Sequence, residues 1–337
     1  MKKPKVKEQE QKPGTLAKIM VNMWNTHFST PIYVNKDGDS VRLNLIKMFD
    51  FSPVTRNSNK KMDVDYKSPS LNVTFPSLDQ NKIAASVWLN DKPTNKWIVG
   101  CHGYNSNRFD VLYLTWHYRA LGYNILTFDF RNHGQSGIDV VTWGYKEKWD
   151  LIAAIKWLME SYTIDHIGLV GTSMGGFTLN YFMLTEPELI KQANIIWGVS
   201  DSAYMSVPKL LERMIADNSA SFFEGYANEV LSQMLMIYKN EYGVDLSGLD
   251  FTKLIQADNM RFPILYIHNR YDKVTDYLDS FRMWTEKNNI EHSVQNHLRI
   301  YDGYHHTKAL IEYKENYIET SLDFVKKAVE DNAKKKK

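Results

Sequence analysis

The sequence predicts an α/β protein in which helices cover both faces of a mostly parallel central sheet. Three observations support this fold class. Short β-rich runs alternate with longer helical patterns, a Gly-x-Ser-x-Gly motif joins one run to one helical pattern, and one long stretch is helical throughout. Alternating strands and helices favour a parallel sheet, whose reactive groups lie on loops beyond the carboxyl ends of the strands.

The composition is that of a globular protein with a large core. The chain has 337 residues, of which 43% are hydrophobic and 24% are charged. A chain of this length buries enough surface to be stable without disulfides or metals. The single cysteine, Cys101, excludes an intrachain disulfide and any Cys-x-x-Cys site, and it fits a reducing compartment.

Charge is unevenly distributed along the chain. Residues 1–13 carry five lysines against two glutamates, and residues 326–337 carry six lysines against two acidic residues. The region between them is therefore net acidic, although the whole chain carries +2. A nucleic-acid-binding protein concentrates positive charge on its folded body, so we expect no nucleic-acid partner. Both lysine-rich ends are predicted to be disordered, solubilising tails.

The first expected element is an amphipathic helix behind the lysine-rich start. Such a helix can lie on a membrane surface, which would make residues 1–27 a peripheral contact at the inner face of the membrane. It can also pack on the rest of the chain, which is the commoner use. No run of 18 apolar residues is present, so we expect no transmembrane helix and a cytoplasmic protein. The apolar residues that share a helical face are Leu16, Ile19, Met20, Met23 and Trp24.

From about residue 66 the pattern becomes regular. Each expected strand is a short run rich in β-branched and aromatic residues, and each expected helix has apolar residues at 3.6-residue spacing. One helix is marked by Leu151, Ile152, Ile155, Leu158 and Met159, and the last by Leu310, Tyr313, Tyr317, Leu322 and Val325. The expected strands are residues 84–89, 97–101, 124–128, 167–170, 195–199, 264–267 and 298–301.

The helical stretch, residues 201–258, lies between two expected strands and is predicted to be a cap over the site. Its helical patterns cover residues 207–215 and 227–238. The predicted organisation is an N-terminal extension (1–65), a core formed by two segments (66–200 and 259–330), the cap, and a lysine-rich tail (331–337).

The cap is rich in apolar side chains, for which two roles are open. They can face an apolar substrate, or they can hold the cap to the core, which is the more frequent arrangement. These side chains are Met205, Leu210, Met214, Phe222, Phe223, Met234 and Met236.

The sharpest chemical signal is the segment Gly171-Thr172-Ser173-Met174-Gly175. It follows the apolar run 167–170 and precedes the helical stretch 177–184, which is the strand–turn–helix context of a nucleophile elbow. A serine at such a turn projects its hydroxyl above the sheet, while the glycines let strand and helix pass closely. The start of the helix then supplies N–H groups and a positive dipole end. Ser173 is therefore the predicted nucleophile.

A nucleophilic serine needs a histidine base and a carboxylate that orients it. Asp272 follows the expected strand 264–267 by five residues, and His306 follows the expected strand 298–301 by five. Both positions are on loops, and both suit side chains that converge on Ser173. The predicted catalytic residues are therefore Ser173, Asp272 and His306.

Spacing alone leaves rivals for two of these roles. His305 is an alternative base, and Asp276 and Asp201 are alternative acids. The oxyanion hole needs two backbone N–H groups, for which the candidates are Met174, directly after the nucleophile, and Tyr104, on the loop after strand 97–101.

Taken together, these motifs resemble those of the α/β-hydrolase superfamily over residues 66–330, and most closely those of bacterial esterases and lysophospholipase-like or monoacylglycerol-lipase-like hydrolases. The resemblance implies the α/β-hydrolase fold and favours His306 over His305, through the family's Gly-x-x-His spacing. It also implies that Arg131 and His133 belong to a structural loop near the site. The motifs are His102-Gly103, Asp129-Phe130-Arg131-Asn132-His133-Gly134-Gln135-Ser136-Gly137, residues 171–175, Asp201-Ser202, Ile267-His268 with Asp272, and Gly303 with His306.

The chain departs from the family pattern near the acid. Asn269 stands where the family commonly has glycine, and Thr275-Asp276 stands where it commonly has Val-Pro. Both departures concern the loop that carries Asp272.

The leading prediction is a serine hydrolase of carboxylic esters, with acyl esters or lipid-like molecules as substrates. A peptidase or amidase, or a thioesterase, would use the same three residues, because the pocket and not the elbow selects the substrate. A non-catalytic binding protein is the alternative from another class, and it would predict a degraded catalytic set. No metal or other cofactor is expected, since no metal-ligand spacing and no nucleotide motif is present. The sequence makes no prediction about oligomeric state.

Overall fold

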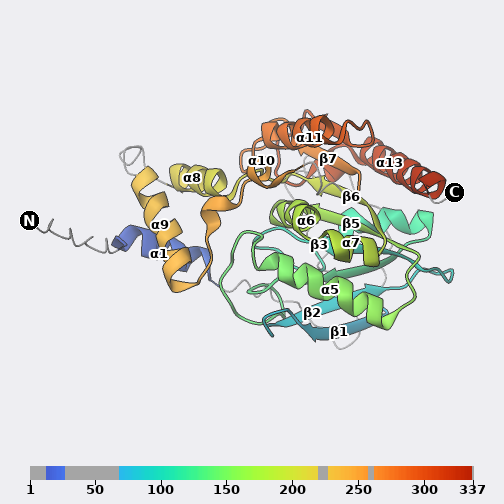
Figure 1. Cartoon of the computed structure of the whole chain (residues 1–337), viewed down its shortest axis with the longest axis horizontal. Coiled ribbons are helices and arrows are strands. Elements are labelled where there is room, and N and C mark those ends of the chain that lie inside the picture. The colour runs from blue at the N-terminus through green and yellow to red at the C-terminus, as the bar shows by residue number, and fades with distance from the viewer. Residues whose placement is uncertain (1–12, 27–67, 219–226, 257–261, 336–337) are drawn as a thin grey trace, which may run out of the picture.

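A computed structural model describes residues 13–26, 68–218, 227–256 and 262–335 of the chain. These residues contain one eight-stranded sheet, with the order β1-β2-β4-β3-β5-β6-β7-β8. β2 pairs antiparallel with β1 and with β4, and the other neighbouring strands are parallel. Figure 1 shows this sheet between layers of helices, so the predicted α/β fold class is confirmed. The strands are β1 (Leu71–Pro76), β2 (Lys82–Trp88), β3 (Lys96–Cys101), β4 (Asn124–Phe128), β5 (His166–Thr172), β6 (Ile195–Asp201), β7 (Ile264–Asn269) and β8 (His297–Tyr301).

All seven predicted strands are present, and β1 is the strand that the sequence pattern does not predict. It is an edge strand, paired only with β2 in the described residues, and Phe75 is its one fully buried residue. An edge strand that buries so little lacks the apolar run by which the other strands are recognised.

Two hydrophobic clusters cover the two faces of the sheet. Adjacent residues of a strand point to opposite faces, and Ile98 and Val99 of β3 accordingly belong to different clusters. Helices α5 (Glu147–Ser161), α6 (Met174–Thr185), α7 (Pro187–Gln192) and α11 (Tyr277–Glu291) contribute to the first cluster. Helices α4 (Leu112–Thr115), α12 (Ala309–Glu312) and α13 (Lys314–Lys335), with the 3₁₀ helix η1 (Trp116–Leu121), enclose the second.

Between β6 and β7, in the stretch predicted to be a cap, lie α8 (Val207–Asn218), α9 (Ala227–Glu241), the 3₁₀ turn η3 (Leu246–Gly248) and α10 (Phe251–Leu254). Met205, Leu210 and Met234 are buried in the first hydrophobic cluster. These side chains therefore hold the helices to the core. Met214 and Met236 are half-buried, and the predicted contacts of Phe222 and Phe223 lie outside the described residues.

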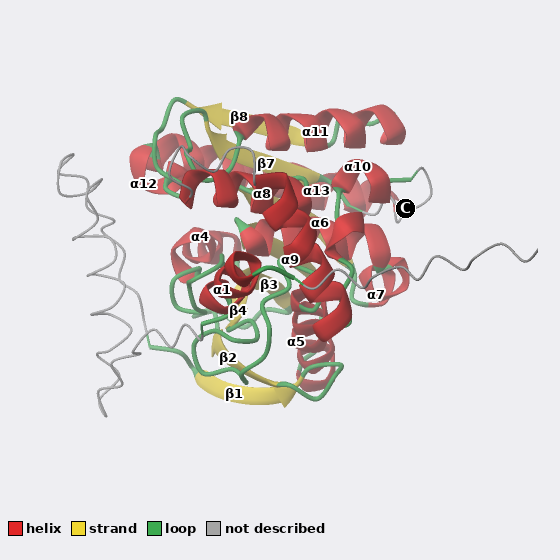
Figure 2. Cartoon of the chain, turned by 90° about the vertical axis from the view of Figure 1, so that its left-hand side faces the viewer, coloured by secondary structure: helices red, strands yellow, loops and turns green. Residues whose placement is uncertain are grey.

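Helix α1 (Thr15–Trp24) docks on the protein through one side only. Met20 and Trp24 are buried, and the Trp24 ring meets the Trp143 ring edge-on at 5.7 Å. Figures 1 and 2 show α1 beside α9, where the Gly14 N–H donates to Gln233 Oε1 (2.9 Å). The apolar face expected from the sequence is thus divided, because its other three members remain exposed: Leu16 (43%), Ile19 (55%) and Met23 (49%).

The residue after α1 ties this helix to loops of the core. Asn25 accepts hydrogen bonds from the Asn132 side chain at its carbonyl (2.9 Å) and from the Val141 N–H at its side-chain oxygen (2.6 Å). The Tyr104 hydroxyl donates to the carbonyl of Trp24 (3.1 Å). Among the described residues, no helix is both long and apolar enough to cross a membrane.

At the other end of the chain, α13 runs on to Lys335. The prediction of a disordered end over residues 326–337 is therefore wrong for residues 326–335, and residues 336–337 lie outside the described residues. The helix continues because Val325 and Ala328 anchor it to the second cluster. Lysines in its last turn also suit the negative end of the helix dipole.

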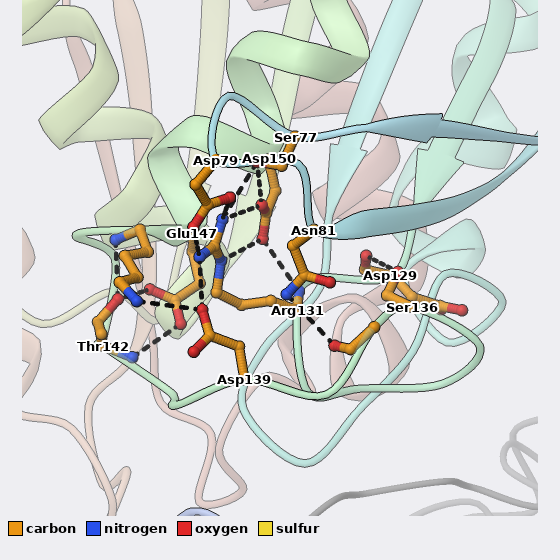
Figure 3. A network of polar contacts seen from close by, with 12 residues as sticks. Ser77, Asp79, Asn81, Asp129, Arg131, Ser136, Asp139, Thr142, Glu147 and Asp150 are labelled. Atoms are coloured by element: carbon orange, nitrogen blue, oxygen red, sulfur yellow. Dashed lines mark hydrogen bonds and ion pairs between the residues drawn. The ribbon is translucent and has the colours of Figure 1, made fainter. Parts of the chain in front are cut away.

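A buried ion network around Arg131 connects the β1–β2 hairpin, the loop after β4 and the start of α5 (Figure 3). The Arg131 side chain is completely buried. Its guanidinium donates to Asp150 (Nη2 to Oδ1, 2.7 Å), Asp79 (Nη1 to Oδ2, 2.7 Å) and Asp139 (Nη1 to Oδ2, 2.8 Å). A Ser77 hydroxyl accepts from Nη2 as well (3.1 Å). Every guanidinium nitrogen thus has a partner, which is the condition for a buried charge to be tolerated.

We predict that Arg131→Met lowers the free energy of unfolding by about 3–5 kcal/mol, because it leaves the fully buried carboxylate of Asp150 without its cationic partner. Urea denaturation followed by circular dichroism measures this loss. Lys326→Met is the matched control, since Lys326 pairs with Asp323 at the surface, where such pairs contribute about 0–1 kcal/mol. Equal effects of the two substitutions would contradict the structural role of Arg131.

The docking of α1 generates a second prediction. Trp24→Ala removes a buried aromatic side chain and is expected to lower the free energy of unfolding by about 3–5 kcal/mol. Ile19→Ala, on the exposed side of the same helix, should stay within about 0.5 kcal/mol of the wild type. If both variants unfold at the wild-type urea concentration, α1 is not docked in solution.

Candidate active site

The turn between β5 and α6 holds Ser173 in an unusual backbone conformation, with φ 52° and ψ −118°. A positive φ is costly for a residue with a side chain and is found where a site requires it. The flanking glycines make the turn possible. A Cβ on Gly171 would lie 2.4 Å from the carbonyl oxygen of Gly175, and one on Gly175 would lie 2.2 Å from that of Cys101. Strand and helix therefore approach closely enough to raise the Ser173 hydroxyl above the sheet.

The structure brings the three predicted catalytic side chains into one hydrogen-bonded line. Ser173 Oγ lies 2.9 Å from His306 Nε2, and His306 Nδ1 lies 2.7 Å from Asp272 Oδ2. Each side chain comes from a loop or turn after a parallel strand of the same sheet, β5, β8 and β7 respectively. With Nδ1 donating to the carboxylate, Nε2 is free to accept the serine proton.

Asp272 is held as an ionised acceptor. Its Oδ1 accepts from the N–H groups of Val274 (2.8 Å) and Thr275 (3.2 Å). Burial alone would raise its pKa, but the hydrogen bonds from His268 and His306 outweigh this effect and hold the pKa well below the usual carboxyl value. The carboxylate is thus charged at neutral pH and is able to stabilise an imidazolium at His306.

The two departures from the family pattern form hydrogen bonds of their own. The Asn269 side chain donates to the His305 carbonyl (2.8 Å) and to Glu312 (3.1 Å), so it connects the end of β7 to the histidine loop. The Thr275 hydroxyl donates to the Ser202 carbonyl (3.0 Å) and also lies 3.2 Å from Asp272 Oδ2. These polar side chains link the loops on which the acid and the base are placed.

The rival residues are engaged elsewhere. His305 is half-exposed and its Nδ1 lies 2.6 Å from Glu312 rather than near Ser173. Asp201 accepts from the hydroxyls of Ser202 (2.7 Å) and Tyr317 (2.8 Å). Asp276 caps α11 by accepting from the Leu278 N–H (3.0 Å).

The two predicted oxyanion segments meet at the nucleophile. Met174 begins α6, so its N–H has no carbonyl partner within the helix. The loop with Gly103 and Tyr104 passes the serine so closely that a Cβ on Gly103 would lie 3.3 Å from Ser173 Cβ. The Tyr104 side chain turns away to Trp24 and the Trp143 ring.

Two buried histidines fix this loop. His102 accepts from the Phe130 N–H at Nε2 (2.9 Å), and its Nδ1 lies 2.7 Å from the Gly103 carbonyl. His133 accepts from the Asn105 N–H at Nε2 (3.2 Å). Burial, followed by the proximity of His133, lowers the pKa of His102 well below its usual value. Both rings serve as neutral supports of the loop.

A cavity of about 270 Å³ opens beside Ser173. Its wall contains polar side chains that the motifs do not predict, among them Asp110, Tyr113 and Lys308. Lys308 follows His306 by two residues, which is a local signal that could have been followed. Asp110 and Tyr113 reach the site only through the packing of the segment before and within α4, for which the sequence offers no motif.

Comparisons with known proteins agree with the observed fold. The profile of a family described as "alpha/beta hydrolase fold" matches residues 96–238. A curated relative, the uncharacterized protein YqkD of Bacillus subtilis (strain 168), is 38% identical over 88 residues, which are 25% of this chain and 28% of that protein. The match thus spans less than a third of the relative's length.

Solved structures share the fold at lower identity. The Pyrococcus furiosus esterase Pf2001 has a TM-score of 0.60 and 23% identity, with 81% of this chain and 95% of the esterase covered. The acylaminoacyl peptidase of Pyrococcus horikoshii has a TM-score of 0.56 and 16% identity, with 78% of this chain and 42% of the peptidase covered. An esterase of Exiguobacterium antarcticum has a TM-score of 0.54 and 16% identity, with coverages of 76% and 100%.

The parallel sheet, the elbow at Ser173 and the family profile all lead to the same assignment. The chain has an α/β-hydrolase fold, for which the family profile matches residues 96–238, and this fold resembles that of solved esterases.

Proposed function

We propose that the protein is a serine hydrolase that cleaves carboxylic esters through an acyl-enzyme. The observation that carries the proposal is the continuous line from Ser173 Oγ to His306 Nε2 (2.9 Å) and from His306 Nδ1 to Asp272 Oδ2 (2.7 Å). A nucleophile, a base and an orienting carboxylate at these distances are the elements of acyl transfer.

In the first half of the reaction, Ser173 Oγ attacks the ester carbonyl while His306 Nε2 takes its proton. Asp272 stabilises the resulting imidazolium without taking the proton itself. The N–H groups of Met174 and Tyr104 are the proposed donors to the developing oxyanion, and the loss of one such donor typically costs a hundred- to a thousandfold in rate. Collapse of the intermediate transfers the imidazolium proton to the departing alcohol and leaves Ser173 acylated.

In the second half, His306 removes a proton from water, which attacks the acyl group. The second tetrahedral intermediate releases the carboxylic acid and returns the proton to Ser173. The neutral histidines 102 and 133 take no part in these proton transfers, because their ring nitrogens are engaged with the loop backbone.

Peptides, other amides and thioesters are the alternative substrates, since the same residues hydrolyse them on related folds. A lipid-like substrate receives little support from the contacts. The cavity beside Ser173 is lined mainly by polar residues, whereas Met205, Leu210 and Met234 are buried in the core cluster. Residues 201–258 remain the proposed cap, and membrane contact through residues 1–27 is a further proposal, which only the exposed side of α1 supports.

The first prediction from this mechanism concerns the nucleophile. Ser173→Ala should reduce the hydrolysis of 4-nitrophenyl esters, from acetyl to palmitoyl, by at least about a thousandfold. A fluorophosphonate should label the wild type stoichiometrically and leave the variant unlabelled, as intact-protein mass spectrometry would record. Wild-type protein that takes up no label would contradict an activated serine, whereas labelling without ester turnover would redirect the search to amides and thioesters.

The adjacent histidines provide a matched pair for the base. His306→Ala should lower kcat by about a thousandfold or more, because it removes the only base within reach of Ser173 in the described residues. His305→Ala should keep kcat within about threefold, since His305 contacts Glu312 instead. Comparable losses in both variants would show that the loop, rather than one imidazole, is required.

A further inference from the structure

The wall of the cavity beside Ser173 contains a lysine whose ammonium has no carboxylate partner. Among the described residues, no carboxylate lies within 4.0 Å of Lys308 Nζ, and none accepts a hydrogen bond from it. Its Nζ lies over the ring of Tyr113, 5.6 Å from the ring centroid. Tyr113 lines the same cavity. An ammonium has three donors, so those of Lys308 are available to a group inside the cavity.

The acidic residue of the cavity does not neutralise this lysine directly. Asp110 uses Oδ2 to accept from the Ser106 hydroxyl (3.0 Å) and from the Asn107 amide (2.9 Å). Burial lowers the pKa of Lys308, while Asp110 and Asp201 oppose that effect from a distance. The Asp110 carboxylate therefore favours the charged form of the lysine without accepting a hydrogen bond from it.

The position of Lys308 is also fixed relative to the reacting groups. It lies two residues after His306, and the Tyr113 hydroxyl donates to the carbonyl of Thr307 between them. Lys308 itself precedes α12, where its carbonyl accepts from the N–H groups of Ile311 and Glu312 (both 3.0 Å). A ligand group bound by this lysine would thus lie at a defined place beside Ser173.

The size of the cavity limits what the lysine can meet. About 270 Å³ is below the usual range of drug-sized ligand pockets, so it suits a small fragment. A cation in such a partly desolvated place attracts an anion more strongly than a surface lysine does. We propose that Lys308 binds an anionic group, a carboxylate or a phosphate, carried by a small ester substrate in the cavity beside Ser173. This substrate class rests on the proposed ester hydrolysis.

Matched pairs of esters test the proposal and locate the anion. The mono-4-nitrophenyl ester of adipic acid is compared with 4-nitrophenyl hexanoate, which places the charge on the acyl side. 4-Acetoxybenzoate is compared with its methyl ester, which places the charge on the leaving group. We expect the wild type to prefer the anionic member of one pair, and Lys308→Met to lower that preference in kcat/KM at least tenfold, with the neutral ester changed less than threefold.

Control variants separate charge recognition from folding. Lys308→Arg should retain most of the preference, because it keeps the positive charge. Lys156→Met removes an exposed lysine of α5 and should leave both members of each pair unchanged. Wild-type protein with no preference in either pair, or equal losses on anionic and neutral esters in Lys308→Met, would overturn the proposal.

A binding measurement makes the result independent of turnover. Monomethyl adipate and dimethyl adipate are titrated calorimetrically into Ser173→Ala, with and without Lys308→Met. We expect Lys308→Met to weaken the binding of the monoester at least fivefold and to leave the binding of the diester unchanged. This result would support anion recognition even if the protein hydrolyses no ester, and then only the proposed reaction would fail. If the protein hydrolyses esters but neither binding nor substrate preference depends on Lys308, the proposed reaction stands and the proposed anion recognition fails.

Discussion

The buried guanidinium of Arg131 is the interaction on which the loops around the site depend. It joins three carboxylates from three segments: Asp79 between β1 and β2, Asp139 after β4, and Asp150 in α5. A buried cation of this kind stabilises a structure only when all of its donors are matched. The arrangement therefore leaves the loop after β4 one conformation in which the charges are satisfied.

Hydrogen bonds and ion pairs connect this loop to the segment beside Ser173. The loop carries Asp129, which accepts from the Arg108 N–H (2.7 Å) and pairs with its guanidinium. His133, on the same loop, accepts a hydrogen bond at Nε2 from the N–H of Asn105 (3.2 Å), which belongs to the segment that carries Arg108. Gly134 is required here, because its φ is +52° and a Cβ would lie 2.3 Å from the Asp129 carboxylate. The loop at Tyr104, the proposed oxyanion donor, is thus held from the β4 side by fixed polar contacts as well as by packing.

The acid and base loops are organised by a separate set of contacts. Asn269 connects the end of β7 to the histidine loop, and Thr275 connects the acid loop to β6 through the Ser202 carbonyl. The side chains that depart from the family pattern therefore support these loops with hydrogen bonds of their own. Two sets of loops, one supported by the contacts of Arg131 and the other by the contacts around Asp272, meet at Ser173. The turn between β5 and α6 holds this serine at a positive φ.

Local patterns in the sequence determined the strands with continuous apolar runs, the elbow at Ser173 and the order of serine, acid and base. Each of these features depends on residues that are close in the chain and on the known geometry of a parallel sheet. β1 was not predicted because it has no continuous apolar run: Leu71, Val73 and Phe75 alternate with polar residues, and of these only Phe75 is buried. Tertiary structure alone decided which apolar residues of α1 are buried, since Trp24 meets Trp143 more than a hundred residues away. It also decided between His305 and His306 by geometry, and it placed Lys308 and Asp110 in one cavity. The burial of α1 and the lining of the cavity depend on contacts between distant segments, for which no spacing in the chain is diagnostic, whereas the family's Gly-x-x-His spacing already favours His306.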